Sequence, residues 1–205
     1  MARRSDHTRE QLHRMALAAA RAIVAKEGLR GLSTRRIAKK LGYSPGTLYQ
    51  LFVDLDDLIL HLNTTTLEAL LKACDGINLS GDPEAALDDL AERYIHFVNA
   101  HPRLWSALFE HSLPRGKDLP DWYTGTVEKL LGLVVIALEP VIAGDTTKQR
   151  EQEALVLWAS LYGIASLASA DKLGPNANPT EMVKALIANY VAGLRQRTRQ
   201  ASMSG

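Results

Sequence analysis

Residues 33–52 read STRRIAKKLGYSPGTLYQLF, and this stretch predicts two short helices joined by a tight turn. Ser33 is placed to cap the first helix, and Gly42 supplies the positive φ that a tight turn needs at its end. Pro45 opens the second helix, because proline at the first helical position lacks only an N–H that has no partner there. Ala38 is small enough for the helices to touch. Together these features predict a helix-turn-helix.

Apolar spacing and charge support the same interpretation. The residues that would hold the helix pair together are Ile37, Leu41, Leu48 and Leu51. Residues 1–52 carry eleven Lys and Arg against three acidic residues, a net charge of +8, whereas the rest of the chain carries −7. A basic N-terminal segment on an otherwise acidic chain suggests that the N-terminal end binds a polyanion. The alternative is that these charges only form a solvated surface.

The remaining sequence predicts helices throughout, since helical periodicity dominates and no convincing strand pattern appears. The expected helices cover residues 8–27, 54 to about 74, 83–100, 102–111, a segment after Pro120 that Pro140 breaks or kinks, about 146–171, and 179–198. With the two short helices of the motif, this predicts an all-α protein of about nine helices.

Composition limits the class of protein. The chain has 205 residues, 46% of them hydrophobic, and a single cysteine, Cys74, which fits a reducing cytoplasm. Its longest apolar run, residues 130–138, is far shorter than the roughly 20 residues of a membrane span. No metal-binding or cofactor-binding motif is evident, so none is expected.

The pattern STRxIAxxLGYSxGTLYxxF resembles the DNA-binding signature of the tetracycline-repressor (TetR) family, with weaker similarity over residues 10–70. The resemblance implies a three-helix DNA-binding domain at residues 8–54. It also implies a helical effector-binding and dimerisation domain at residues 55–205.

The resemblance also implies a set of DNA contacts: Thr34, Arg35, Ser44, Pro45, Gly46, Thr47, Tyr49 and Gln50. Hydroxyls near a helix N-terminus suit phosphate, which agrees with these positions. Gly46 permits close backbone approach, and Gln50 suits either an adenine edge or a phosphate. For Tyr49, packing in the core is the alternative.

Two positions depart from the family pattern. Leu51 stands where the family commonly has histidine, and Leu55 stands where it commonly has a phosphate-binding lysine. Acidic residues flank Leu55, so weaker DNA affinity is expected there. The arginines near the N-terminus are expected to compensate: Arg3, Arg4 and Arg9.

The C-terminal half resembles TetR sensor domains that carry a Trp-x-x-x-His-Gly motif, although Tyr162 replaces the histidine here. The segment His101-Pro102-Arg103-Leu104-Trp105 also fits that subgroup. Ligand pockets are mostly apolar, so we expect a small apolar or aromatic effector. The candidate contacts are Trp105, Phe109, Trp122, Trp158 and Tyr162. Core packing is the alternative for each of them.

The last two helices are expected to form a homodimer. The apolar stripe of the last helix comprises Val183, Leu186, Ile187, Tyr190, Val191 and Leu194. The preceding helix offers a face of Leu155, Ala159, Tyr162, Ser166 and Ala170. An intramolecular core is the alternative, but a helix-turn-helix protein reading a palindrome needs two-fold symmetry.

The sequence therefore predicts a DNA-binding transcriptional regulator, and most specifically a repressor that a small effector releases from a palindromic operator. An architectural DNA-binding protein without an effector is one alternative. A helical enzyme is the other, with candidate chemistry at His96, His101, Glu110 and His111, but their spacing matches no metal or nucleophile motif. No enzymatic activity is expected.

Overall fold

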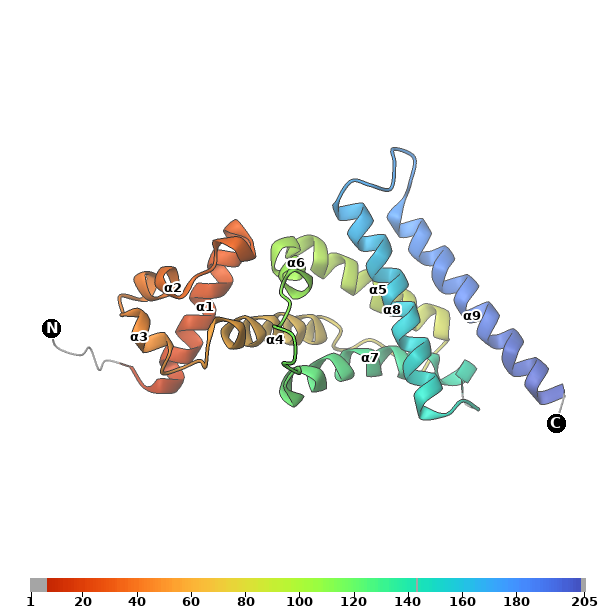
Figure 1. Ribbon diagram of the computed structural model, residues 1–205. Helices are drawn as coiled ribbons and strands as arrows, with labels where there is room; N and C mark the ends of the chain where they lie inside the picture. Colours follow the sequence, from red (N-terminus) through yellow and green to blue (C-terminus); the bar gives the residue numbers. More distant parts are fainter. Residues whose placement is uncertain (1–6, 143, 204–205) are drawn as a thin grey trace. The chain divides into compact units, whose positions relative to one another are not determined.

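The computed structural model describes residues 7–142 and 144–203, and every regular element in them is helical (Figure 1). The α-helices are α1 (Arg9–Glu27), α2 (Thr34–Leu41), α3 (Pro45–Leu48), α4 (Leu55–Ala73), α5 (Pro83–Ala100), α6 (Pro102–Glu110), α7 (Asp121–Ile142), α8 (Thr147–Ser169) and α9 (Pro179–Met203). The predicted all-α class is confirmed. None of the described helices is long and apolar enough to cross a membrane.

Local signals explain most helix ends. Thr8 and Gln11 form a reciprocal capping box at the start of α1, and Gly28 follows its end with φ 73°. Two details were not predicted. A short 3₁₀-helix, η1 (Leu29–Gly31), lies between α1 and α2, and α9 runs five residues beyond the expected end at residue 198. Pro140 lies inside α7, which ends only two residues later at Ile142.

The contacts divide the chain into two compact units. The first unit contains the chain up to Ala69 together with His101–Thr124, and the second contains Leu70–Ala100 and the chain from Gly125 onward. The first unit thus joins α1–α3 and most of α4 to α6. The division into functional domains after residue 54 stays a prediction.

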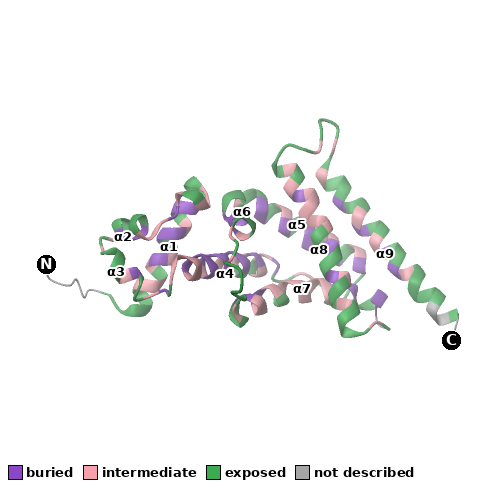
Figure 2. Cartoon of the chain, in the orientation of Figure 1, coloured by how far each residue is buried: buried purple, intermediate pink, exposed green. Residues whose placement is uncertain are grey.

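In the first unit, one apolar core holds the helix-turn-helix to its neighbours (Figure 2). Ile37, Ala38 and Leu48 are almost fully buried in it, and Leu41 and Leu51 pack against its edge. Helix α6 contacts α1 and contributes Leu104 and Ala107 to the same core. Removing large side chains from such a core typically costs about 2–5 kcal/mol, so this packing fixes the angle between α2 and α3.

A stack of rings also lies in the first unit. The His13 ring lies 4.6 Å from Phe52 and 5.1 Å from His61, and His61 stacks on Trp122 at 4.3 Å. Burial, His61 and Arg9 lower the pKa of His13, although Asp57 opposes them. The folded protein therefore binds a proton at His13 less readily than the unfolded chain does.

We expect the melting temperature to fall as the pH is lowered through about 6.5, the ordinary histidine pKa. A depressed histidine pKa means that the unfolded state binds more protons, so stability rises with pH across this range and is lost below it. Thermal unfolding of wild type and His13→Gln between pH 8 and pH 5.5 checks this. An equally steep fall in the variant would show that His13 is not the responsible group.

In the second unit, α9 packs against α5 and α8. Val183, Ile187, Val191 and Leu194 are at most 5% exposed within the single chain (Figure 2). For these four residues the intramolecular core, rather than the expected dimer stripe, is correct. The reason is that α5, some hundred residues earlier, covers this side of α9.

Polar contacts reinforce the same packing. The Tyr190 hydroxyl donates to the Glu153 carboxylate, and Arg197 donates to Glu153 at 2.5 Å and to Asp145 at 2.7 Å. Burial alone would raise the pKa of Glu153, but the hydrogen bonds from Tyr190 and Arg197 outweigh it and lower that pKa. These bonds tie α9 to α8 and to the turn before it.

Candidate nucleic-acid interface

A cap and a tight turn position the two helices of the motif, although the expected cap of α3, Ser44, makes no side-chain capping hydrogen bond. The Ser33 hydroxyl accepts a hydrogen bond from the Arg36 N–H at 3.3 Å, which starts α2. Gly42 ends α2 in the left-handed conformation, with φ 75° and ψ 24°. The Tyr43 N–H then donates to the Ala38 carbonyl at 3.0 Å. This is the hydrogen bond of a Schellman turn, and it directs the chain into α3.

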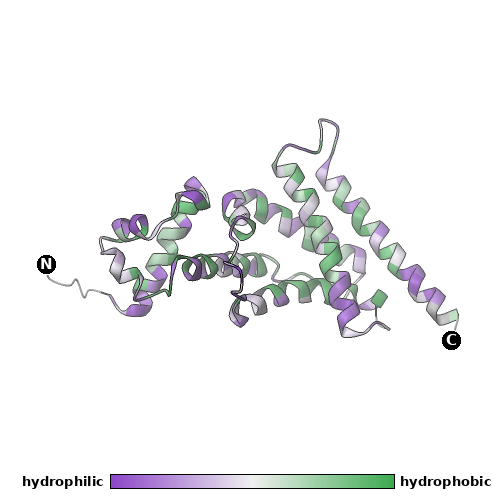
Figure 3. Ribbon diagram, in the orientation of Figure 1, coloured by the Kyte–Doolittle hydropathy of each residue, from purple (hydrophilic) through white to green (hydrophobic). Residues whose placement is uncertain are grey.

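The proposed DNA-contacting residues lie at the surface of this motif. Ser44, Pro45, Gly46, Tyr49 and Gln50 are exposed. The Tyr49 side chain is 59% exposed, so the alternative of core packing does not hold. On α2, Arg35 is exposed as well and Thr34 is partly exposed. Figure 3 shows hydrophilic residues along α2.

The hydroxyl groups of the site lie in pairs. The Thr34 and Tyr49 hydroxyl oxygens are 3.5 Å apart, which brings the start of α2 to the end of α3. The Ser44 and Thr47 hydroxyl oxygens are 3.3 Å apart at the N-terminus of α3. Hydroxyls in such positions can turn their protons toward an incoming phosphate oxygen.

Gly46 is open on the outside of α3. A side chain added there would meet only the Ser44 hydroxyl, at 3.6 Å, within the described residues. The fold of the chain therefore does not require glycine at this position. Glycine at this position would instead allow the α3 backbone to approach another molecule closely.

Arg36 does not belong to this surface, although it lies beside Arg35 in the sequence. Its guanidinium donates to both carboxylate oxygens of Glu27 at 2.6 Å and to the Gly31 carbonyl at 2.8 Å. The hydrogen bond from Arg36 lowers the pKa of Glu27. These bonds tie α2 to the end of α1.

The sequence did not predict one hydrogen bond near the helix-turn-helix. His7 Nδ1 lies 2.9 Å from the Tyr43 hydroxyl, which links the segment before α1 to the turn of the motif. The two residues are 36 positions apart, and no local sequence signal predicts their contact. Arg3 and Arg4, expected to assist DNA binding, lie outside the described residues, and Arg9 is exposed at the start of α1.

The two departures from the family pattern have structural roles. Leu51 and Leu55 are partly buried and pack against the core of the first unit. At positions where the family commonly has a histidine and a lysine, these two leucines bury apolar surface against the core. Neither residue offers a charge or a hydrogen-bond donor to DNA from its side chain.

The candidate effector contacts fall in both units. Trp105, Phe109 and Trp122 belong to the first unit, and Trp158 and Tyr162 to the second. Trp105 and Phe109 meet edge to face at 5.6 Å, and Trp158 stacks with Tyr162 at 5.8 Å. Trp105 is buried, whereas Phe109 and Trp122 are each 40% exposed.

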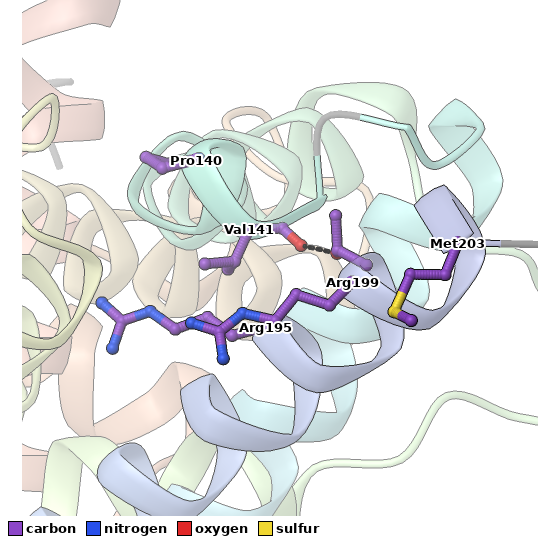
Figure 4. A pocket seen from close by; sticks show the side chains of 6 residues that line it. Pro140, Val141, Arg195, Arg199 and Met203 are labelled. Atoms are coloured by element: carbon purple, nitrogen blue, oxygen red, sulfur yellow. Dashed lines mark hydrogen bonds between the residues drawn. The ribbon is translucent and has the colours of Figure 1, made fainter.

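The second unit also contains an open cavity of about 430 Å³ near the end of α9 (Figure 4). Figure 4 shows two arginines, Arg195 and Arg199, extending beside Val141. The cavity is lined by Pro140, Val141, Arg195, Thr198, Arg199 and Met203. None of the five aromatic candidates lines it.

Two family models match the chain. The model for bacterial regulatory proteins of the tetR family matches residues 16–62. The model for the tetracyclin repressor-like C-terminal domain matches residues 87–190, half of the chain. The Trp-His-Gly subgroup stays a prediction. No curated protein matches the chain significantly.

Solved structures share this fold. A protein of unknown function from Rhodococcus sp. RHA1 is 26% identical, with a TM-score of 0.73 over 95% of this chain and 100% of that one. A transcriptional regulator from Rhodococcus sp. Rha1 is 23% identical, with a TM-score of 0.65 over 88% and 96% of the two chains. A tetR-family regulator from Streptomyces coelicolor is 17% identical, with a TM-score of 0.66 over 92% and 88%.

The domain models and the fold point to a transcription factor rather than an enzyme. Among the residues considered for catalysis, His111 is engaged by Asp56, at 2.9 Å. The exposed residues of the helix-turn-helix lie within the match to the tetR-family model over residues 16–62. The chain belongs to the TetR family and is a DNA-binding transcriptional regulator.

Proposed function

We propose that this regulator is a homodimeric repressor that binds a palindromic operator and leaves it when a small, mostly apolar effector binds. The observation that carries the proposal is the exposed surface of α3 and the turn after it, where Gly46, Tyr49 and Gln50 are exposed beside buried Leu48. We expect it to act in the cytoplasm, where bacterial DNA is found.

Selection of bound sequences from a random DNA pool, followed by footprinting, tests the operator. We expect an inverted repeat whose half-sites lie one DNA turn apart, roughly 34–36 Å, or a multiple of that distance. A single unrepeated site bound by a monomer would contradict the dimeric reading of DNA. Equal affinity for selected and random DNA would instead favour an architectural protein.

Exposed surface on α8 and α9 supports the homodimer. Leu155, Val156 and Leu167 on α8 are 45–48% exposed in the single chain. On α9 the exposed positions outside the buried stripe include four small residues, Ala185, Ala188, Ala192 and Gly193, among larger ones such as Met182 and Asn189. Small residues allow helices to approach closely, and a self-complementary patch suits a two-fold dimer. The proposed interface is therefore this exposed face.

Gly46→Ala is expected to weaken operator binding about tenfold, which corresponds to about 1.4 kcal/mol. The added methyl group has room within the chain, at 3.6 Å from Ser44, but would hold the α3 backbone away from DNA. Alanine also favours the helix, so the melting temperature should not fall. Affinity and thermal unfolding of the same preparation check both expectations, and unchanged affinity would remove Gly46 from the interface.

Tyr49→Phe and Thr34→Ala are expected to weaken binding to all DNA sequences alike, because both hydroxyls would contact phosphate. Gln50→Ala should instead relax the preference at one base pair, by about 1–3 kcal/mol. The measurement is affinity for the operator and for its single-base variants. If Gln50→Ala loses affinity evenly across the variants, then Gln50 contacts the backbone and does not read a base.

The aromatic residues of the chain support the proposal that the effector is mostly apolar. Trp158 and Tyr162 form a stacked pair on α8, and both are partly exposed in the single chain. The candidates in the first unit remain Trp105, Phe109 and Trp122. Apolar pockets with a few polar groups, such as a tyrosine hydroxyl, are typical of small-molecule sites.

A further inference from the structure

Three carboxylates gather at the first turn of α4, directly after the helix-turn-helix: Asp54, Asp56 and Asp57. Asp54 follows Tyr49 by five residues, so the chain cannot separate them by more than about 18 Å. Unneutralised carboxylates at this distance would repel the DNA phosphates that the head must approach. The hydrogen bonds and ion pairs of these three carboxylates are therefore relevant to DNA binding.

Each carboxylate has a partner within the first unit. The Asp54 carboxylate accepts the Asp57 N–H at 2.8 Å and the Lys117 ammonium at 2.9 Å. The Asp57 carboxylate accepts the Val53 N–H at 2.9 Å and lies 3.5 Å from His61 Nε2. The bond from the Asp57 N–H makes Asp54 the cap of α4, and the bond from the Val53 N–H ties Asp57 back to the turn before the helix.

The remaining partners come from the segment between α6 and α7. The His111 ring donates from Nε2 to Asp56 at 2.9 Å, and its side chain is only 8% exposed. Lys117 follows six residues later with a side chain 52% exposed. His111 is therefore an anchor for the segment, whereas the Lys117 charge lies at the surface. The Asp57 N–H and then Lys117 lower the pKa of Asp54.

We propose that Lys117 is a positioning residue for DNA binding, which neutralises Asp54 beside the reading head while His111 anchors the segment that carries it. Lys117 thereby places a cation at the first turn of α4, next to Leu55, where the family commonly has a lysine. It does so from a position 63 residues away in the chain. This inference rests on the proposed reading surface of α3.

A double-mutant cycle tests the inference with Lys117→Ala, Asp54→Asn and the double variant. Asparagine caps a helix as well as aspartate does, so Asp54→Asn removes the charge and keeps the start of α4. We expect Lys117→Ala to weaken operator binding about two- to fivefold at about 50 mM salt, and less at about 200 mM, because exposed charges interact weakly and are screened. In the Asp54→Asn background, Lys117→Ala should cost nothing.

Arg115→Ala is the matched control, since Arg115 is an exposed cation of the same segment with no ion pair to the described residues. Its effect, if any, should be the same in the wild type and in the Asp54→Asn background. An equal loss on Lys117→Ala in both backgrounds would mean that Lys117 contacts phosphate itself, and would overturn the proposal. So would an unchanged affinity, or a loss that ignores salt and accompanies a lower melting temperature. Failure of the wild type to select any operator would instead refute the proposed function.

Discussion

Leu155→Glu is expected to convert the proposed dimer into monomers and to abolish operator binding. Leu155 is 48% exposed on α8, so the single chain should tolerate a charge there. Across a two-fold interface the new carboxylate would be buried and would lie near its own copy. Like charges brought together in an interface cost several kcal/mol, which is a loss of roughly 100-fold or more in association.

Sedimentation of wild type and variant at micromolar concentration measures the association directly. The matched control is Asn99→Glu, which adds the same charge at an exposed position of another helix, α5. The control should stay dimeric and should bind the operator. If Leu155→Glu remains a dimer with wild-type affinity for DNA, the interface lies elsewhere on the molecule.

Trp158→Gln is expected to lose the response to effector while keeping operator binding. A ligand changes DNA affinity only through different affinities for the two conformations of the protein, and such coupling is typically about 1–3 kcal/mol. For the wild type this predicts operator affinity roughly 5- to 150-fold lower at saturating effector. We propose α4, which begins beside the reading head, as the element that transmits the change.

The measurement is operator affinity against effector concentration, with circular dichroism to show that the variant is folded. Trp158 stacks on Tyr162 at 5.8 Å and is partly exposed, so glutamine at this position should not empty a buried core site. Asn99→Glu again provides a control that should respond like wild type. A folded Trp158→Gln protein with an unchanged response would make Trp158 a packing residue only.

The local signals of residues 33–52 predicted both ends of α2 and the start of α3. Ser33 caps α2, Gly42 ends it in the left-handed conformation, and Pro45 begins α3. Each of these features depends on neighbours within a few positions, so the amino-acid sequence determines it without knowledge of the rest of the fold. The separation of buried Leu48 from exposed Tyr49 follows from the same short helix.

Only the tertiary structure decided which charges and apolar faces remain available to a partner. Arg35 and Arg36 are neighbours in sequence and both are exposed, yet only Arg36 is paired with Glu27. Lys117 pairs with Asp54 at the start of α4, and the stripe of α9 that resembled a dimer face is covered by α5 and α8. These outcomes depend on contacts between residues far apart in the chain, whose pairing is set by packing and not by periodicity.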